Sequence, residues 1–393
     1  MGWPRVLVAG GSIGGLTAAV LLRDLGCEVD VYERSQAALE DRGAGIVVLP
    51  VTERYFTERG GEDDRVSLEL TYWTYMDREG NVLSADPDHF RFSGWSTIYR
   101  ALLEAFGPDR YHLGHEMTDF DNRPDGVTLH LADDSSVEGE LLVCADGLLS
   151  TARSILMPEA SPQYAGYAAW RGTTPEAALS EQARADVADS MIYQVLEPGH
   201  ILVYAIPDSE GRTAPPHRII NFVWYRNYPV GGPFEDLMRD RNEVQRTGTM
   251  PPGAIREEHL AEMRSTATEA LAPTLLEVVL GCEQPLIQAV FDLESPRMAF
   301  GRVCLIGDAA IALRPHVAAG QAKACADAWA LRDALARADG DVASALAAWE
   351  PGQLDLGHRA LARTQEMGQA SQFDRTMIPG DPAWKFGLWE PGN

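Results

Sequence analysis

The sequence predicts an α/β protein in which a domain built on a parallel sheet is interrupted by a second domain built on an antiparallel sheet. Three observations support this prediction. A strand pattern, a glycine-rich turn and a helix pattern open the chain over residues 5–34. Alternating and aromatic segments typical of antiparallel strands fill residues 66–92 and 164–293. A buried strand, a loop and a helix pattern then return over residues 301–336, which indicates that the sheet-rich part is an insertion.

The first predicted element is a dinucleotide site. Residues 6–9 predict a buried parallel strand and residues 16–25 a helix, and a second strand leads to Glu33, at the spacing expected for an acid that binds ribose. Glycines allow backbone to approach a pyrophosphate closely, and the helix N-terminus favours its charge. A side chain at the first glycine would fill the space that the pyrophosphate needs. One glycine of G-x-G-x-x-G is replaced by a serine, which keeps the backbone amide: Gly10, Ser12, Gly14, Gly15.

The later elements are predicted from the same periodicities. A glycine-marked loop at residues 42–50 leads into a strand or helix, and antiparallel strands at 66–92, a helix at 95–107 and strands at 127–145 follow. Residues 164–293 contain strands on both sides of a polar helical stretch at 234–281. A strand, a loop and a helix follow at 301–336, and a helix with an aromatic tail begins at 341.

The composition argues against several classes of partner. The chain has 393 residues and a net charge of −25, spread as isolated Asp and Glu residues. This charge argues against nucleic acid and anionic membranes and favours a near-neutral substrate. The sequence has no run of eighteen apolar residues and no signal-peptide pattern, so we expect a cytoplasmic protein without a membrane partner. A homo-oligomer is possible.

We expect no metal site. The five cysteines are far apart and form no C-x-x-C pair. His112 and His115 have a ligand-like spacing, but no third ligand lies near them in the sequence.

Three motifs stand in a particular order. The glycine turn with Glu33 comes first, "ADGLLSTAR" follows with a D-G-x-x-S-x-x-R pattern that starts at Asp146, and "GDAAIALRPHVAAGQ" places Pro315 seven residues after Asp308. Together they resemble the FAD-dependent aromatic hydroxylases of the para-hydroxybenzoate hydroxylase superfamily. Over nearly the whole chain, "GGSIGGLTAA", "DVYERS", "GAGIVV", "YAGYAAWRG", "RPHVAAGQAKA" and "GDPAWKFGL" are similar to hydroxypyridine hydroxylases, both the 2,6-dihydroxypyridine 3-hydroxylases and those of the piericidin type.

This resemblance implies a glutathione-reductase-like FAD-binding Rossmann domain with an inserted antiparallel-sheet substrate domain and C-terminal helices. The FAD-binding domain would comprise residues 1–65, 94–160 and 296–340, and the substrate-binding sheet domain residues 66–93 and 161–295. Residues 341–393 would form the C-terminal helix and tail. FAD would be bound, while NAD(P)H would bind transiently and O2 would be the second substrate.

The resemblance also assigns residues to FAD. Backbone of the glycine turn would meet the pyrophosphate, Glu33 the ribose and Arg34 the adenine, and Asp308 the ribityl or pyrophosphate portion. Two loops would line the flavin, one near its N5 and one at its N1–C2=O edge. The full set is Gly10, Ser12, Ile13, Gly14, Gly15, Glu33, Arg34, Gly45, Ile46, Val47, Tyr99, Asp146, Asp308, Pro315, Ala318, Ala319 and Gly320. Many relatives carry arginine where Tyr99 stands.

The reaction implied is hydroxylation of a hydroxypyridine or phenol ring beside an existing hydroxyl, through a flavin C4a-hydroperoxide. His316 is the candidate for moving the ring proton, and Tyr204 and Trp224 are candidates for the substrate wall. His316 could instead cap a helix or pack on flavin, and the two aromatic residues could be core. We expect Arg171 to form a structural pair.

Three other functions stay open. A flavin-dependent halogenase shares the fold, but its usual W-x-W-x-I-P segment is absent from the sequence. A plain NAD-dependent dehydrogenase leaves Asp146 and Asp308 without purpose. A protein that sequesters FAD and a small aromatic, or regulates through them, has no sequence feature against it.

Overall fold

The computed structural model describes residues 2–39, 45–59 and 66–393. Its first layer is a sheet of six strands, in the order β17 (Ala299–Phe300), β18 (Val303–Leu305), β10 (Leu141–Cys144), β1 (Arg5–Ala9), β2 (Glu28–Glu33) and β6 (Tyr111–Leu113). All neighbouring pairs are parallel except β17 and β18, which form an antiparallel hairpin. The short apolar strands are buried on both faces, as parallel strands require.

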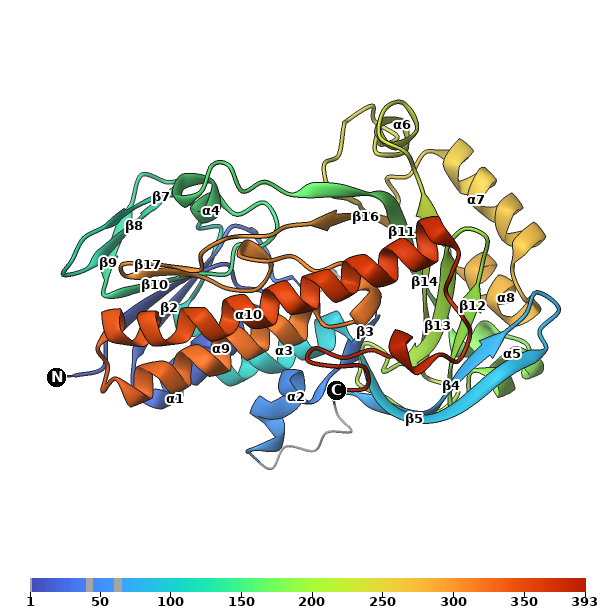
Figure 1. Ribbon diagram of the computed structural model, residues 1–393, viewed down its shortest axis with the longest axis horizontal. Helices are drawn as coiled ribbons and strands as arrows, with labels where there is room; N and C mark the ends of the chain where they lie inside the picture. Colours follow the sequence, from blue (N-terminus) through green and yellow to red (C-terminus); the bar gives the residue numbers. More distant parts are fainter. Residues whose placement is uncertain (1, 40–44, 60–65) are drawn as a thin grey trace.

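Helices cover one face of this sheet, and a small sheet covers the other (Figure 1). Helix α1 (Ile13–Leu25) packs between α3 (Trp95–Phe106) and α9 (Gly320–Arg337), and α2 (Pro50–Thr57) lies beside α9. The small sheet has the order β7 (Met117–Asn122), β8 (Val127–Leu131) and β9 (Ser136–Gly139), with α4 (Thr151–Leu156) against β7.

The second large layer has nine strands. Their order is β15 (Thr249–Met250), β16 (Leu286–Asp292), β11 (Gln163–Pro175), β14 (Ile219–Asn227), β13 (His200–Ile206), β12 (Ser190–Val195), β4 (Leu68–Met76), β5 (Val82–Gly94) and β3 (Gly45–Val48). Only the β12–β4 pair is parallel. Strand β3, expected in the nucleotide domain, pairs with β5 here, so the larger sheet reaches into the first domain. Residues 42–44 of the expected loop lie outside the described residues.

The polar helical stretch predicted at 234–281 is three helices. These are α6 (Pro233–Leu237), α7 (Glu257–Ala270) and α8 (Pro273–Gly281), with α5 (Glu181–Asp186) packed on the last. Prolines and a glycine at residues 251–253 interrupt the pattern, because proline lacks the amide that a helix interior needs.

Helix α10 (Val342–Gln369) runs beside α9 and then along the molecule toward the larger sheet (Figure 1). A short helix, residues 370–374, ends it, and the chain turns back past a further one at residues 382–384. Within the described ranges, no helix is long and apolar enough to span a membrane. Among the same residues, no group of three or more His, Cys, Asp or Glu side chains is placed to hold a metal ion.

Candidate active site

A cavity of about 790 Å³ lies where the two large sheets meet. On the side of the parallel sheet, it is lined by residues 12–14 of the glycine turn, residues 306–308 after β18, and the loop before α9. On the other side, it is lined by β3 and by side chains of β12, β13, β14 and β16. The cavity therefore joins the predicted dinucleotide turn to the aromatic sheet.

The backbone conformation and close contacts of the glycine turn require glycine at two of its positions. Gly10 has φ +100°, and a Cβ there would lie 2.4 Å from the Ala145 carbonyl oxygen. A Cβ at Gly15 would lie 1.9 Å from the Gly10 oxygen. Ser12 has φ −77°, an ordinary conformation, so serine fits the turn as expected. Ser12, Ile13 and Gly14 line the cavity, which leaves the N-terminus of α1 facing it.

The acid at the end of β2 holds this turn in place. The Glu33 carboxylate is buried and accepts hydrogen bonds from the backbone N–H groups of Gly11 and Ser35, each at 2.9 Å. The neighbouring Arg34 is exposed. Binding of ribose by Glu33 and of adenine by Arg34 stays a prediction.

Tyr99 differs from the expectation that it contacts FAD. Its side chain is fully buried, and its hydroxyl accepts a hydrogen bond from the Leu39 N–H and meets the Tyr111 hydroxyl at 3.2 Å. Tyr111 in turn donates to the Gly11 carbonyl at 2.9 Å. One helical turn earlier on the same face of α3, Trp95 stacks on Tyr99 and lines the cavity. Tyr99 therefore supports the turn from behind.

The Gly307–Ala309 turn carries the acid of the cavity wall. Asp308 lines the cavity and is exposed to it, and its position inside the protein raises the pKa of its carboxyl although the nearby Lys323 ammonium opposes the rise. Fully buried Lys323 and Asp327 hold the turn: Asp327 accepts from the Gly307 N–H and from Lys323, both at 2.8 Å. Sequence reasoning missed this pair, whose only signal is its i, i+4 spacing in an otherwise apolar helix.

The second motif supports the same turn. Arg153 is buried and donates to the Ala309 carbonyl at 3.1 Å. Asp146 was expected at the cofactor, but its carboxylate accepts from the Ala152 N–H at 3.2 Å, and the cavity is lined there by Ala145, Gly147 and Leu148. The motif thus braces the β10 and β18 ends against each other.

Strand β3 presents residues 45–47 to the cavity. The Gly45 N–H donates to the Asn221 side chain at 2.8 Å, and Arg171 donates to the Gly45 carbonyl at 2.7 Å. A Cβ at Gly45 would lie 2.7 Å from the Tyr204 ring. Arg171 also binds Gln288, so it is a structural pair-former, as expected, that lines the cavity as well.

His316 lies in the cavity wall at the junction of the two sheets. Its Nε2 is 2.6 Å from the Tyr167 hydroxyl, and its ring centroid is 5.3 Å from that of His200. Burial, with help from the Arg314 charge, lowers the pKa of His316 to about 3. Burial also lowers the pKa of His200 well below its usual value. Both imidazoles are therefore neutral at pH 7.

Aromatic residues of the larger sheet complete the wall. Tyr204 lines the cavity, and burial raises its pKa to about 12, so the phenol stays protonated. Trp224 does not fulfil the expected role: Val223 and Tyr225 line the cavity, and Trp224, between them, is buried under the Arg226 guanidinium on the other face. Sequence reasoning missed Tyr193, His200 and Tyr225, because these strands are apolar on both faces.

The residues present fit FAD. The turn at the α1 N-terminus suits a pyrophosphate, Asp308 suits the hydroxyls of a ribityl chain, and residues 45–47 of β3 line the cavity where a flat ring would lie. The start of α9, after Ala318 in the left-handed region (φ 54°), leaves backbone N–H groups at the cavity. Fold and site together define the class of protein as a flavoprotein with a cavity between its two large sheets.

Comparisons with known proteins identify the family. Residues 164–292 match a family model described as FAD binding domain-like. The 2,6-dihydroxypyridine 3-monooxygenase of Paenarthrobacter nicotinovorans is 36% identical over 385 residues, 98% of this chain and 96% of that protein. The solved 2,6-dihydroxypyridine-3-hydroxylase of Arthrobacter nicotinovorans superposes with a TM-score of 0.93 at 34% identity, covering 99% and 98% of the two chains. The 6-hydroxynicotinate 3-monooxygenase of Bordetella bronchiseptica is 27% identical, covering 98% and 95%.

The chain belongs to the family of FAD-dependent aromatic-ring monooxygenases that includes 2,6-dihydroxypyridine 3-monooxygenase. It is an enzyme that uses FAD, NAD(P)H and O2 on a small aromatic substrate. The halogenase and sequestering-protein alternatives find no support among these relatives.

Asp308→Ala should weaken FAD binding by about 1.5–3 kcal/mol, roughly ten- to 150-fold in Kd, because hydrogen bonds to a charged group are lost. Asp308→Asn, which keeps the shape and the acceptor oxygen, should lose less. Fluorescence quenching of FAD by the apoprotein measures both. Asp333→Ala, which removes a partly exposed carboxylate of α9, is the matched control. Equal Kd values for Asp308→Ala and the wild type would remove Asp308 from the cofactor site.

Proposed function

We propose that the protein hydroxylates a small hydroxypyridine-type ring at the carbon next to an existing ring hydroxyl. The observation that carries this proposal is the cavity end at which His316, from the loop before α9, meets the uncharged aromatic side chains of the larger sheet. The relatives support the ring class, since two of them are named for hydroxylating 2,6-dihydroxypyridine and 6-hydroxynicotinate.

FAD would be held by backbone at residues 12–15, 307–308 and 318–320, with Asp308 as its charged contact. Bound FAD supplies the electron transfer from NAD(P)H and the activation of O2 that an aromatic ring cannot achieve alone. The protein has the remaining tasks. It must align the ring with the flavin, exclude water and stabilise negative charge on the ring oxygen.

His316 would stabilise that charge as a hydrogen-bond donor. We expected a general base, but an imidazole with a pKa of about 3 is too weak a base at neutral pH. Burial raises the pKa of the Tyr167 phenol although the Arg314 guanidinium opposes the rise, so this phenol keeps its proton and donates a hydrogen bond to His316 Nε2. The tautomer then carries its proton on Nδ1, which can donate to a ring oxygen.

The sheet residues would grip the ring. Tyr193 and Tyr225 supply flat faces beside the two histidines, and Leu202 and Val223 supply apolar contact that excludes water. Tyr204, with a protonated phenol near Arg171, would donate to a second polar atom of the ring. Such a wall suits a small planar molecule with polar atoms on its edge.

An isotope experiment tests the proposal. The protein, 2,6-dihydroxypyridine and NADH or NADPH are incubated under ¹⁸O2, and the product is analysed by mass spectrometry. We expect one ¹⁸O atom per product molecule and one NAD(P)H oxidised for each ring hydroxylated. 6-Hydroxynicotinate and 4-hydroxybenzoate serve as comparison rings. Label from water, or NAD(P)H oxidation that returns every ring unchanged, would overturn the proposal.

Other expectations stay predictions. They are the cytoplasmic location, self-association, and the lack of nucleic acid or membrane partners.

A further inference from the structure

We infer that the C-terminal segment, residues 380–393, contributes Phe386 to the substrate site, and that this side chain limits the size of the ring that the site accepts. The inference rests on the proposed function, because it concerns the same cavity. This segment contains the "GDPAWKFGL" motif, for which the cofactor and the sheet provide no role.

Phe386 lies in the cavity wall although it is far from the other lining residues in the sequence. Its side chain is 3% exposed and lines the cavity. Its ring centroid is 4.6 Å from that of Trp73 on β4 and 5.4 Å from that of Phe90 on β5. Trp73 contacts Tyr193, which stacks on His200 at 4.9 Å. Phe386 therefore continues the aromatic wall that Tyr193 and His200 form.

Contacts on both sides of Phe386 hold its backbone. Lys385 pairs with Asp88 on β5 at 2.7 Å, and Arg363 on α10 donates to the carbonyls of Lys385 and Gly387, the latter at 3.0 Å. The Phe386 carbonyl accepts from the Gly392 N–H at 2.7 Å. The ring is thus fixed from α10 and from the larger sheet, so it acts as a rigid wall.

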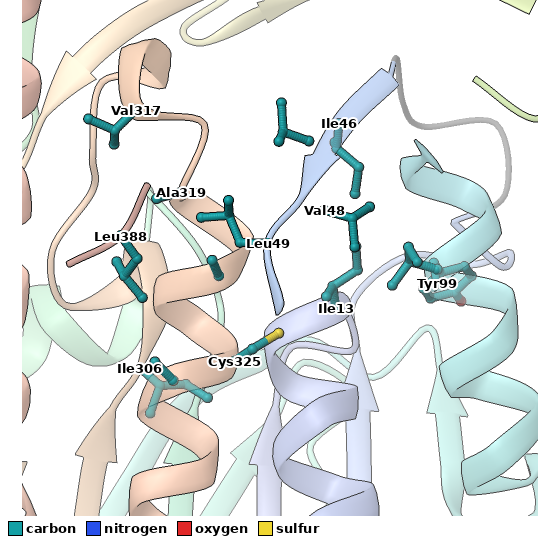
Figure 2. Packing of buried hydrophobic residues seen from close by; sticks show 14 of the residues in the cluster. Ile13, Ile46, Val48, Leu49, Tyr99, Ile306, Val317, Ala319, Cys325 and Leu388 are labelled. Atoms are coloured by element: carbon teal, nitrogen blue, oxygen red, sulfur yellow. The ribbon is translucent and has the colours of Figure 1, made fainter. Parts of the chain in front are cut away.

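The same segment contacts the loop that would face the flavin. The Gly387 N–H donates to the Val317 carbonyl at 3.0 Å, one residue before Ala318 in its left-handed conformation. Leu388 is 2% exposed and lies on the side of the packed cluster that holds Val317 and Ala319 (Figure 2). One segment therefore sets the distance between the flavin loop and the aromatic wall.

These contacts determine which edge of a ring Phe386 can face. A phenyl ring offers no hydrogen bond, whereas His316 and Tyr204 offer polar groups elsewhere in the cavity. A bound hydroxypyridine would direct its polar atoms to those residues and a C–H edge to Phe386. Because the closely packed side chains around Phe386 cannot move to make space for extra atoms, a ring with an alkyl group on that edge should bind poorly.

Binding measurements on the FAD-loaded protein test this inference. The probes are 2,6-dihydroxypyridines that carry hydrogen, methyl, ethyl or propyl at ring carbon 3 or 4, and the readout is the change in flavin absorbance on binding, without NAD(P)H. Phe386→Ala is compared with the wild type and with Trp389→Ala, a large aromatic residue of the same segment that is 40% exposed. FAD content and melting temperature are measured for each variant.

The quantity compared is the ratio of the affinity for the propyl-substituted ring to the affinity for the unsubstituted ring. For substitution at one of the two ring carbons, we expect this ratio to be at least about tenfold higher in Phe386→Ala than in the wild type. Trp389→Ala should leave that ratio unchanged. Should Phe386→Ala fail to retain FAD, Phe386→Leu and Phe386→Val are used, and the ratio should rise with the volume removed. An unchanged ratio in FAD-loaded variants would overturn the inference. A wild type that binds none of these rings would instead contradict the proposed substrate class.

Discussion

Gly10→Val should abolish FAD binding, the largest effect that we expect from one substitution. At φ +100° an L side chain is strained by about 1–3 kcal/mol, and its Cβ would meet the Ala145 carbonyl oxygen at 2.4 Å. Ala145 belongs to the backbone directly after β10, so relief requires the ends of β1 and β10 to separate. The turn would then lose the shape that directs the α1 N-terminus to the cavity. We expect FAD affinity to fall at least about a hundredfold.

Flavin content after purification and fluorescence titration of the apoprotein with FAD measure this loss. Gly2→Val is the matched control, because a Cβ there has nothing within 4 Å. The structure also corrects the sequence-based reason, which was that valine would fill the pyrophosphate space: the added side chain meets protein backbone instead. A yellow Gly10→Val protein with the affinity of the wild type would contradict the assigned turn.

His316→Ala should slow hydroxylation roughly 10²-fold, or raise the fraction of the reducing equivalents that is released as peroxide by a similar factor. FAD should stay bound in this variant. The variant loses the hydrogen-bond donor at the ring oxygen. Tyr167→Phe removes only the partner that selects the tautomer, so it should show a smaller effect of the same kind. Single-turnover hydroxylation, with product and peroxide both quantified, separates these outcomes.

The pH dependence distinguishes the donor role from a general base. Because the pKa of His316 is about 3, its imidazole does not change protonation between pH 5 and 8. The wild-type rate of the chemical step should therefore show no inflection near pH 6.5 that the His316→Ala variant lacks. Such an inflection would instead support His316 as a general base. Unchanged rate and coupling in His316→Ala would remove His316 from the mechanism and leave the flavin chemistry in place.

Local patterns in the sequence were sufficient to predict the cofactor domain. The strand, glycine turn and helix over residues 5–34 are a local unit, and glycine at position 10 follows from a backbone conformation that only glycine adopts without strain. Serine at position 12 was correctly read as compatible, because its φ is ordinary. The strands that precede the motifs at Asp146 and Asp308 pair side by side.

The aromatic wall was not predictable in the same way. Strand β14 is apolar on both faces, so periodicity could not tell whether Trp224 or its neighbours Val223 and Tyr225 faced the cavity. The same limit applied to Tyr99, whose helix face was predictable but whose depth was not: Trp95 covers it and occupies the cavity wall.

The sequence by itself determined the fold class and the glycine turn, because these depend on local backbone geometry and on apolar periodicity, and its motifs indicated the class of protein by their resemblance to a known family. Tertiary structure alone decided the chemistry of His316 and the position of Phe386. Burial between two sheets makes the imidazole neutral, and a segment seventy residues after His316 returns to close the wall beside it. Desolvation and long-range contact are properties of the packed chain, so no local pattern records them.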